Sequence, residues 1–246
     1  ATAIRAGLNA GVSQIERNQS NQYVNHLILI TDGRTYGDED DCLKIAKECR
    51  NKGIGISGMG IGEDWNDQFL DRLTNETGGD SAYISSPEFV TRFLEDRIRS
   101  LATAYAERTQ VSVTTSAGVE VKEITRLSPN TITLPTVTQP LALGSLDGLS
   151  VTSLLFQLHI SAKDIPPGEF FAGRIDVSGE VLGGSKRMDR VIHDISLEVS
   201  NDVTNEEPPG PLLDGLSKLM LYRLQERARD ALASGNIVEA TRSLQH

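Results

Sequence analysis

The chain has 246 residues, of which 38% are hydrophobic and 24% charged, as in an ordinary globular protein of one or two domains. The net charge of −10 repels phosphate backbones, so we expect no nucleic acid among its partners. No hydrophobic run reaches membrane-spanning length, so we expect no membrane partner. The lack of secretory disulfides favours a cytoplasmic location.

Residues 1–107 alternate between helical and strand patterns. Helical spacing links Ala3, Ile4, Leu8, Val12 and Ile15. The apolar run from His26 to Ile30 then predicts a strand buried on both faces, as in parallel sheets. A helix over 38–52, a strand over 54–61, a short helix near 69–73, a strand at 82–84 and a helix from Pro87 towards Tyr105 follow. This alternation predicts an α/β layer with a parallel sheet.

Residues 108–207 change to alternating β-rich runs separated by turn signals. The runs cover residues 110–114, 119–124, 131–134, 149–160, 170–177 and 192–199. About seven short strands at this spacing predict an antiparallel β-sandwich domain.

Residues 208–246 form the third segment, whose first residues complete a proline-rich break over 205–211. Leu216, Leu219, Met220 and Leu224 recur at helical spacing, and a Ser-Gly-Asn turn at 234–236 separates this helix from a second one. We therefore expect a helical segment, which stops in mid-pattern at His246.

The two cysteines, Cys42 and Cys49, lie seven residues apart in the predicted helix. That spacing separates them by roughly 10 Å along the helix axis, which is too far for a disulfide. We expect two semi-buried thiols, as in a reducing compartment.

Asp32 is the clearest candidate for a ligand-binding residue. It follows the buried strand directly and precedes Gly33. Ligands of open α/β sheets bind outside the carboxyl ends of the strands, and a carboxylate there can hold a hard cation or a water bound to one. From local context alone, a simple turn after the strand is the competing interpretation.

Ordered motifs support the ligand interpretation of Asp32. The strand that ends in Thr31-Asp32-Gly33, the glycine-rich strand over 55–62, the segment over 73–79 that ends in Gly78-Gly79, and Thr2 with Ile4, Gly7 and Leu8 resemble successive parts of the von Willebrand factor A-type domain. The resemblance covers about 100 residues. It implies that residues 1–107 are the C-terminal part of such a domain, in a protein of the bacterial type.

The resemblance also implies a metal ion-dependent adhesion site. In that family an Asp-X-Ser-X-Ser loop, one threonine and one aspartate bind Mg²⁺, and Thr2 and Asp32 match the last two. No Asp-X-Ser-X-Ser motif precedes Thr2 in the chain. We therefore expect Mg²⁺, or Mn²⁺ or Ca²⁺, only if an upstream segment supplies that loop.

The resemblance implies a protein-binding module in which Mg²⁺ bridges to an acidic residue of a partner protein. The alternative is a metal-independent scaffold in a multiprotein assembly. An enzyme is not expected, because no nucleophile or acid–base pair shows a supporting spacing. The sequence leaves the identity of the partner and the oligomeric state open.

Two other groups receive structural interpretations. His26 opens a buried strand, so we expect it to support the fold. Arg92, Arg97 and Arg99 are expected on a solvated, charged face of the helix that starts at Pro87.

Overall fold

A computed structural model describes residues 3–18, 23–32, 37–62, 66–84, 86–136, 139–161, 165, 167–183, 187–202 and 207–244. The chain divides into two compact units, each built from three separate stretches. Unit 1 contains Ala1–Thr114, Thr138–Ser150 and Arg174–Asp194. Unit 2 contains Thr115–Val137, Val151–Gly173 and Ile195–His246.

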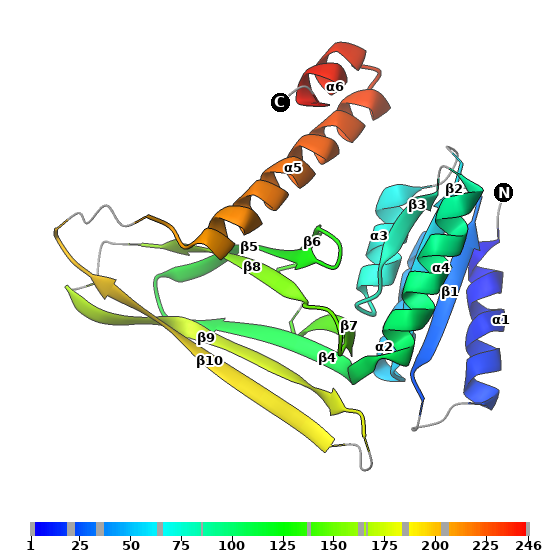
Figure 1. Cartoon of the computed structure of the whole chain (residues 1–246), viewed down its shortest axis with the longest axis horizontal. Helices are drawn as coiled ribbons and strands as arrows, with labels where there is room; N and C mark the ends of the chain where they lie inside the picture. The colour runs from blue at the N-terminus through cyan, green and yellow to red at the C-terminus, as the bar shows by residue number, and fades with distance from the viewer. Residues whose placement is uncertain are drawn as a thin grey trace. The chain divides into compact units, whose positions relative to one another are not determined.

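Unit 1 begins with a three-stranded parallel sheet in the order β1-β2-β3, formed by β1 (Asn25–Thr31), β2 (Ile54–Ile61) and β3 (Ser81–Ile84) (Figure 1). Asn25 lies opposite Ile54, and Gly58 lies opposite Ser81. The strands are short and rich in isoleucine, as expected for a parallel sheet that is covered by helices. The predicted α/β fold class is confirmed.

Four helices surround this sheet: α1 (Ile4–Arg17), α2 (Glu39–Asn51), α3 (Asp67–Asn75) and α4 (Pro87–Ala102). One sheet face forms the hydrophobic core with α1, α2 and α3 through Leu8, Leu27, Ala46, Ile54, Ile56 and Leu70. Both cysteines belong to this core as free, buried thiols, so the prediction that they do not pair is confirmed. Burial raises the pKa of Cys42 to about 12 and that of Cys49 to about 11.

Helix α4 is shorter than the sequence suggests, because it ends at Ala102 and Tyr105 already belongs to a strand. Thr103 is the C-cap residue of α4. Its hydroxyl oxygen lies 2.6 Å from the Asp147 carboxylate and 2.8 Å from the carbonyl oxygen of Arg99, the two acceptors within reach of its single O–H, and its carbonyl accepts from the backbone N–H of Gly148 (2.8 Å). Contacts to a later segment therefore turn the chain from helix to strand.

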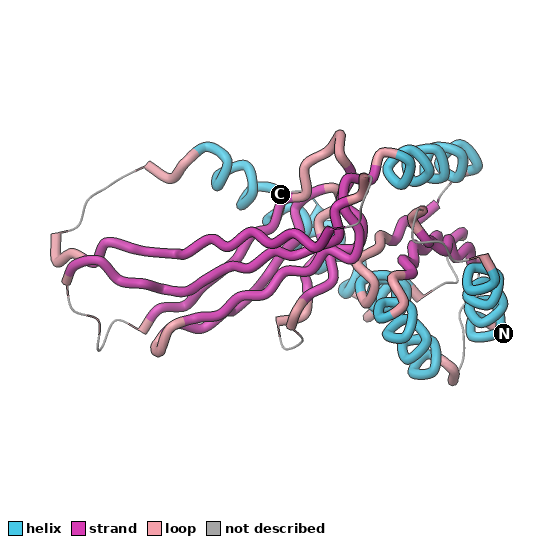
Figure 2. Tube along the Cα trace, turned by 90° about the horizontal axis from the view of Figure 1, so that it is seen from below, coloured by secondary structure: helices cyan, strands magenta, loops and turns pink. Residues whose placement is uncertain are grey.

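The described residues of the strand-rich stretch form seven antiparallel strands; all strands of the chain are magenta in Figure 2. They are β4 (Ala104–Thr115), β5 (Val119–Ser128), β6 (Ile132–Leu134), β7 (Leu141–Asp147), β8 (Ser153–Ile160), β9 (Gly168–Val181) and β10 (Arg187–Val199). They form a four-stranded sheet in the order β10-β9-β4-β7 and a three-stranded sheet in the order β6-β5-β8.

The parallel sheet and the strands of unit 1 meet at two glycines. A Cβ atom on Gly78 would lie 2.1 Å from the backbone nitrogen of Gly144, and one on Gly144 would lie 2.7 Å from the carbonyl oxygen of Gly78. Both residues have positive φ, of 73° and 74°, a conformation that favours glycine. Gly144 also lies at an irregularity in the pairing of β4 with β7. The two backbones can touch only because neither residue has a side chain.

Unit 2 contains the antiparallel pair β5–β8 and the C-terminal helices α5 (Gly210–Ala233) and α6 (Ile237–Leu244). Leu219 of α5 is buried, and Arg223 donates to both carboxylate oxygens of Glu123 on β5 (3.0 Å each). Small buried residues line the contact between the helices, namely Ala228, Ala231, Ala240 and Ser243. In the described part of the chain, no helix combines the length and hydrophobicity needed to cross a membrane.

Candidate functional site

Asp32 lies directly after the carboxyl end of β1 and is exposed, whereas the preceding Thr31 is buried. The carboxyl ends of β1, β2 and β3 meet at the same edge of the parallel sheet. Asp32 is therefore at the edge where α/β folds bind ligands. Thr2, the other predicted metal ligand, lies outside the described residues.

The starts of α1 and α2 are joined at this edge by Arg5. The Arg5 backbone N–H donates to the Asp38 carboxylate (3.3 Å), and the Arg5 guanidinium binds Asp41 (3.1 Å). A hydrogen bond from Lys44, followed by one from Arg5, lowers the pKa of Asp41. Asp41, in the first turn of α2, thus pairs with basic side chains of the same unit, and Asp32 is not part of this pairing.

The chemical capacity of this edge is limited within the described ranges. No group of three or more His, Cys, Asp or Glu side chains there could hold a metal ion. Asp32 offers one carboxylate, which is fewer oxygen ligands than Mg²⁺ requires. Of the two predicted metal ligands, the described residues contain Asp32, which by itself does not make up a coordination shell.

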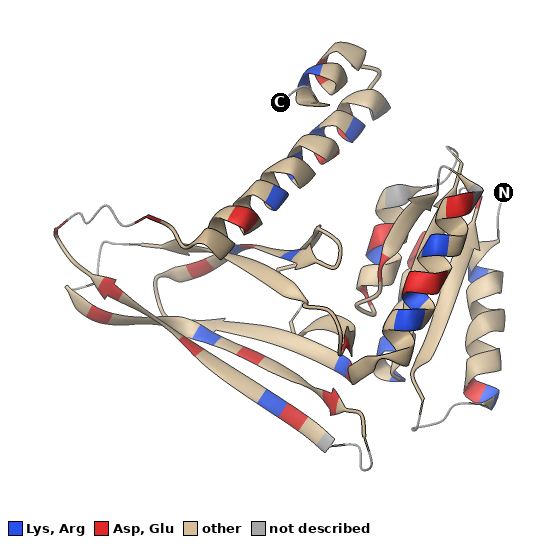
Figure 3. Cartoon of the chain, viewed as in Figure 1, with Lys and Arg blue, Asp and Glu red and all other residues tan. Residues whose placement is uncertain are grey.

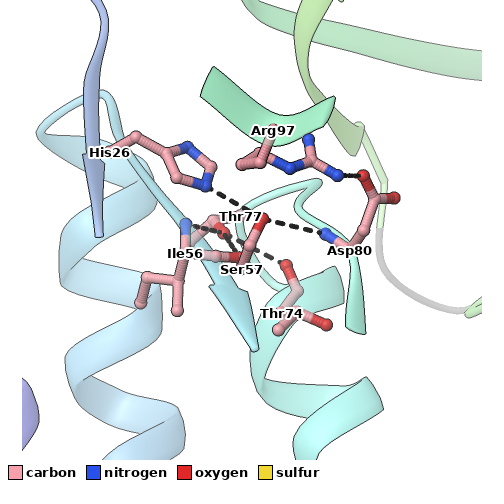
Figure 4. A network of polar contacts seen from close by, with 7 residues as sticks. All are labelled: His26, Ile56, Ser57, Thr74, Thr77, Asp80 and Arg97. Atoms are coloured by element: carbon pink, nitrogen blue, oxygen red, sulfur yellow. Dashed lines mark hydrogen bonds and ion pairs between the residues drawn. The ribbon is translucent and has the colours of Figure 1, made fainter. Parts of the chain in front are cut away.

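A second polar cluster lies inside unit 1, between the parallel sheet and α4 (Figure 4). His26 and Ser57 lie on the sheet face opposite Leu27 and Ile56, and His26 Nε2 shares a hydrogen bond of 2.9 Å with Ser57 Oγ. Gly55 makes room for the ring, because a Cβ atom there would lie 2.4 Å from His26 Nδ1. Burial, together with the positive charge of Arg97, lowers the pKa of His26 to about 4.

Asp80 connects this cluster to α4. Its backbone N–H donates to Ser57 Oγ (3.4 Å), and its carbonyl accepts from the N–H of Gly58 (2.8 Å). Its carboxylate forms an ion pair with Arg97, whose side chain is only 17% exposed. The expectation that Arg97 lies on a solvated face is therefore wrong, because the side chain turns inward to a buried carboxylate.

Thr77 completes the cluster at the free edge of β2. Its hydroxyl accepts the N–H of Ile56 (2.9 Å) and donates to the carbonyl of Thr74 (3.1 Å). Because β3 pairs only with Gly58–Ile61, the hydroxyl replaces the missing strand at this position. Ser57 is fully buried, so the Ser57–His26 pair supports the fold and has no access to a substrate.

Sequence reasoning locates Asp32 and gives His26 a structural role, but it misses Ser57, Asp80 and Arg97 as a cluster. These residues come from β1, β2, the turn before β3, and α4. The Thr-Gly-Gly-Asp turn over 77–80 was the available signal, because a polar residue after a glycine pair can reach back to a neighbouring strand.

A parallel sheet enclosed by helices defines the α/β class of domain, and here an exposed aspartate lies at its carboxyl edge. The family model of the von Willebrand factor type A domain matches residues 1–97. Residues 1–97 therefore belong to a von Willebrand factor type A domain.

Solved structures support the fold over nearly the whole chain. A von Willebrand factor type A protein from Catenulispora acidiphila matches with a TM-score of 0.74 and 17% identity, over 99% of this chain and 58% of that chain. A human COPII-coat protein matches with a TM-score of 0.52 and 16% identity, over 98% of this chain and 33% of that chain. At these identities the likeness concerns the fold alone.

A curated relative comes from the bacterium Synechocystis and is described as an uncharacterized protein. It is 26% identical over 184 residues, which make up 72% of this chain and 43% of the relative. The chain thus spans less than half the length of the curated relative that it matches.

Proposed function

We propose that the protein containing this chain binds a partner protein at the carboxyl edge of the β1-β2-β3 sheet through a divalent metal ion. The observation that carries the proposal is the exposed carboxylate of Asp32 at that edge, within the segment that matches the A-type family. Arg5 supports the site by holding the start of α1 beside the start of α2.

Thr2 and Asp32 are the residues of this chain that we propose as metal ligands, together with an Asp-X-Ser-X-Ser loop from an upstream segment. Mg²⁺ prefers oxygen ligands and is the ion that we favour, with Mn²⁺ or Ca²⁺ as substitutes. With few protein carboxylates around it, such an ion can accept an acidic side chain of the partner as a further ligand. The partner is therefore proposed to present a Glu or Asp.

The test is Mg²⁺-dependent capture of partners by the natural full-length protein and by its Asp32→Ala variant. We expect capture to disappear with the variant, because the substitution removes one of the few charged oxygens at the edge. Glu48→Ala is a matched control, since Glu48 is an exposed carboxylate near the other end of α2. Capture that survives both Asp32→Ala and chelation of the metal would exclude the metal bridge.

A metal-independent scaffold is the alternative, and it is favoured by the shortage of ligands among the described residues. Calorimetric titration of the full-length protein with Mg²⁺ separates the two functions. Heat of binding that Asp32→Ala abolishes supports the metal bridge, whereas no heat supports the scaffold.

For either function we propose binding and not catalysis, in the cytoplasm. The burial of the Ser57–His26 pair supports the first point. The two free, buried cysteines support the second, because secreted proteins commonly pair theirs. A screen for metal-dependent hydrolysis and fractionation of cells would check these two points.

A further inference from the structure

Strand β10 forms an edge of the four-stranded sheet β10-β9-β4-β7. In its unit 1 part, Met188, Val191 and Ile192 are 62%, 65% and 46% exposed. The described strands include none beyond the outer edge of β10, so its outward backbone N–H and carbonyl groups are open to another strand. Such an edge is a surface on which a further strand can pair.

The composition of β10 does not block this pairing. Proline and bulges commonly protect exposed edges, but Arg187–Val199 contains no proline. Apolar residues project on both faces of the strand, because Val191 and Ile192 are neighbours and successive side chains alternate. Charged side chains can also prevent unwanted pairing at an exposed edge, and β10 does contain them. Their arrangement therefore determines which partner strand can pair with β10.

Ion pairs link β9 to β10 and form what we call the charge ladder; the charged positions of both strands are coloured in Figure 3. Arg174 on β9 binds Asp194 on β10 through Nε (2.6 Å) and Nη2 (3.0 Å). Four residues earlier on β10, Arg190 Nε binds Asp176 of β9 (2.7 Å). In this second pair the positive residue is on β10 and the negative residue is on β9, the reverse of the first pair. The edge therefore presents a positive and a negative residue on either side of Ile192.

We propose that β10 pairs with β10 of a second copy of this chain, antiparallel and about a two-fold axis at Ile192. In such a pair, residues that face each other must share a sheet face, so the two-fold axis passes through a residue. A register centred on Arg190 or on Asp194 places like charges opposite each other. A register centred on Val191 or on His193 places a charged residue opposite Ile192. A register centred on Ile192 places Arg190 opposite Asp194 of the second copy, twice.

This register also continues the charge ladder across the interface. Arg174 and Asp194 of one copy are followed by Arg190 and Asp176 of the other, so the signs alternate over four strands. The two Ile192 side chains meet between the charged pairs. Opposite charges and apolar pairs directly across neighbouring strands stabilise a sheet, and a two-fold interface uses each of them twice.

Cysteine cross-linking tests the proposed register. Directly opposed residues of antiparallel strands have Cα atoms about 4.5–5.5 Å apart, within the range of a disulfide. We therefore expect Ile192→Cys to form a covalent dimer under mild oxidation. Cys42 and Cys49 are 0% and 1% exposed and do not compete for the oxidant.

Two matched variants on the same strand serve as controls. Met188→Cys is the first control. Met188 is more exposed than Ile192, but in this register it lies roughly 26 Å from Met188 of the second copy. Val191→Cys lies about 7–8 Å from its counterpart, outside easy disulfide range. Cross-linking of either control as efficient as that of Ile192→Cys would overturn the proposed pairing.

Sedimentation of the unmodified chain tests the dimer itself. We expect a concentration-dependent dimer that Ile192→Lys disrupts, and that Arg190→Glu weakens roughly tenfold by placing like charges opposite each other twice. Circular dichroism checks that both variants keep the fold. A chain that sediments as a monomer at all concentrations overturns the proposal, and so does a dimer that both substitutions leave intact. Neither result depends on a metal ion. The dimer proposal can therefore be contradicted without contradicting the proposed adhesion function, and the reverse also holds.

Discussion

At the scale of single residues, His26 shows how position in the fold sets the charge of a side chain. The ring is packed over Gly55 and hydrogen-bonded to Ser57, with the guanidinium of Arg97 nearby. Burial and then the charge of Arg97 lower its pKa from 6.5 to about 4, against the opposing effect of Asp80. The folded protein therefore keeps His26 neutral at pH values where the unfolded chain protonates it.

Stability should consequently fall as the pH drops from about 6.5 towards 4. In this window the unfolded chain binds a proton that the folded protein does not, so acidification favours unfolding. Above pH 6.5 His26 adds no pH dependence. Across the full window, from pH 6.5 to pH 4, His26 lowers the free energy of unfolding by on the order of 3 kcal/mol. Urea unfolding of the wild type and His26→Gln at several pH values measures this contribution.

The difference between the two proteins is the relevant quantity, because carboxylates titrate in the same range. We expect the wild type to lose more unfolding free energy than His26→Gln as the pH falls from 6.5 to 4. His159→Gln, which replaces an exposed histidine on β8, should follow the wild type. Parallel curves for the wild type and His26→Gln would show that His26 does not carry the effect.

The residue scale also shows what a sequence can predict about a site. Asp32 was predictable because a buried strand, an aspartate and a glycine occur within one short stretch. Arg97 was not, because its ion pair with Asp80 depends on how α4 lies across the sheet. A charged residue at a helical position has the same local pattern whether it faces solvent or a buried carboxylate.

At the scale of elements, the contact between Gly78 and Gly144 holds β7 against the turn before β3. Two backbones touch there, and each glycine has positive φ. A methyl group on either residue would overlap the other backbone. The junction therefore depends on the absence of side chains.

Gly144→Ala should lower the free energy of unfolding by roughly 2–5 kcal/mol. The added Cβ atom would lie 2.7 Å from the Gly78 carbonyl oxygen, and the left-handed backbone adds a conformational cost. Gly118→Ala is the matched control, since Gly118 has φ of 81° but its Cβ would have no neighbour nearer than 3.9 Å. It should cost only about 1–2 kcal/mol. Equal losses in chemical denaturation would mean that backbone conformation, and not the contact, matters.

Strand β7 also shows where prediction from sequence stops. Residues 141–147 follow a proline and include Gly144 and Ser145, so the local pattern favours a turn. Pairing with β4 makes the segment a strand, and the irregular register accommodates the glycine. The strands over 54–61 and 119–124 were predictable because their β-rich pattern is continuous, although β5 extends to Ser128.

At the scale of the whole molecule, the two compact units do not follow the order of the chain. Unit 1 adds Thr138–Ser150 and Arg174–Asp194 to the A-type segment, and unit 2 takes the stretches between and after them. The segment boundaries predicted near 107 and 207 follow changes of local pattern, and such patterns contain no information about which distant strands pair. They stay predictions.

Native-state hydrogen exchange should distinguish the units. We expect amides of β2 and β7 to lose protection together as urea is added, because both belong to unit 1. Amides of β5 and β8 should open with a different free energy. Mass spectrometry of exchanged peptides measures both groups, and Gly144→Ala should reduce protection in β2 as well as in β7. If β7 opened together with β8 and not with β2, the proposed cooperative unit would be wrong.

The interleaving of the units also has a consequence for synthesis on the ribosome. The last stretch of unit 1 ends at Asp194, about 80 residues after Thr114. At roughly 5–20 residues per second, unit 1 waits about 4–16 s for these strands after its first stretch has been translated. Until β7 and then β9 have been translated, β4 lacks the partners that enclose it in the finished sheet. The nascent chain thus passes through a period in which chaperone capture competes with aggregation, and slower translation between residues 115 and 194 would lengthen it.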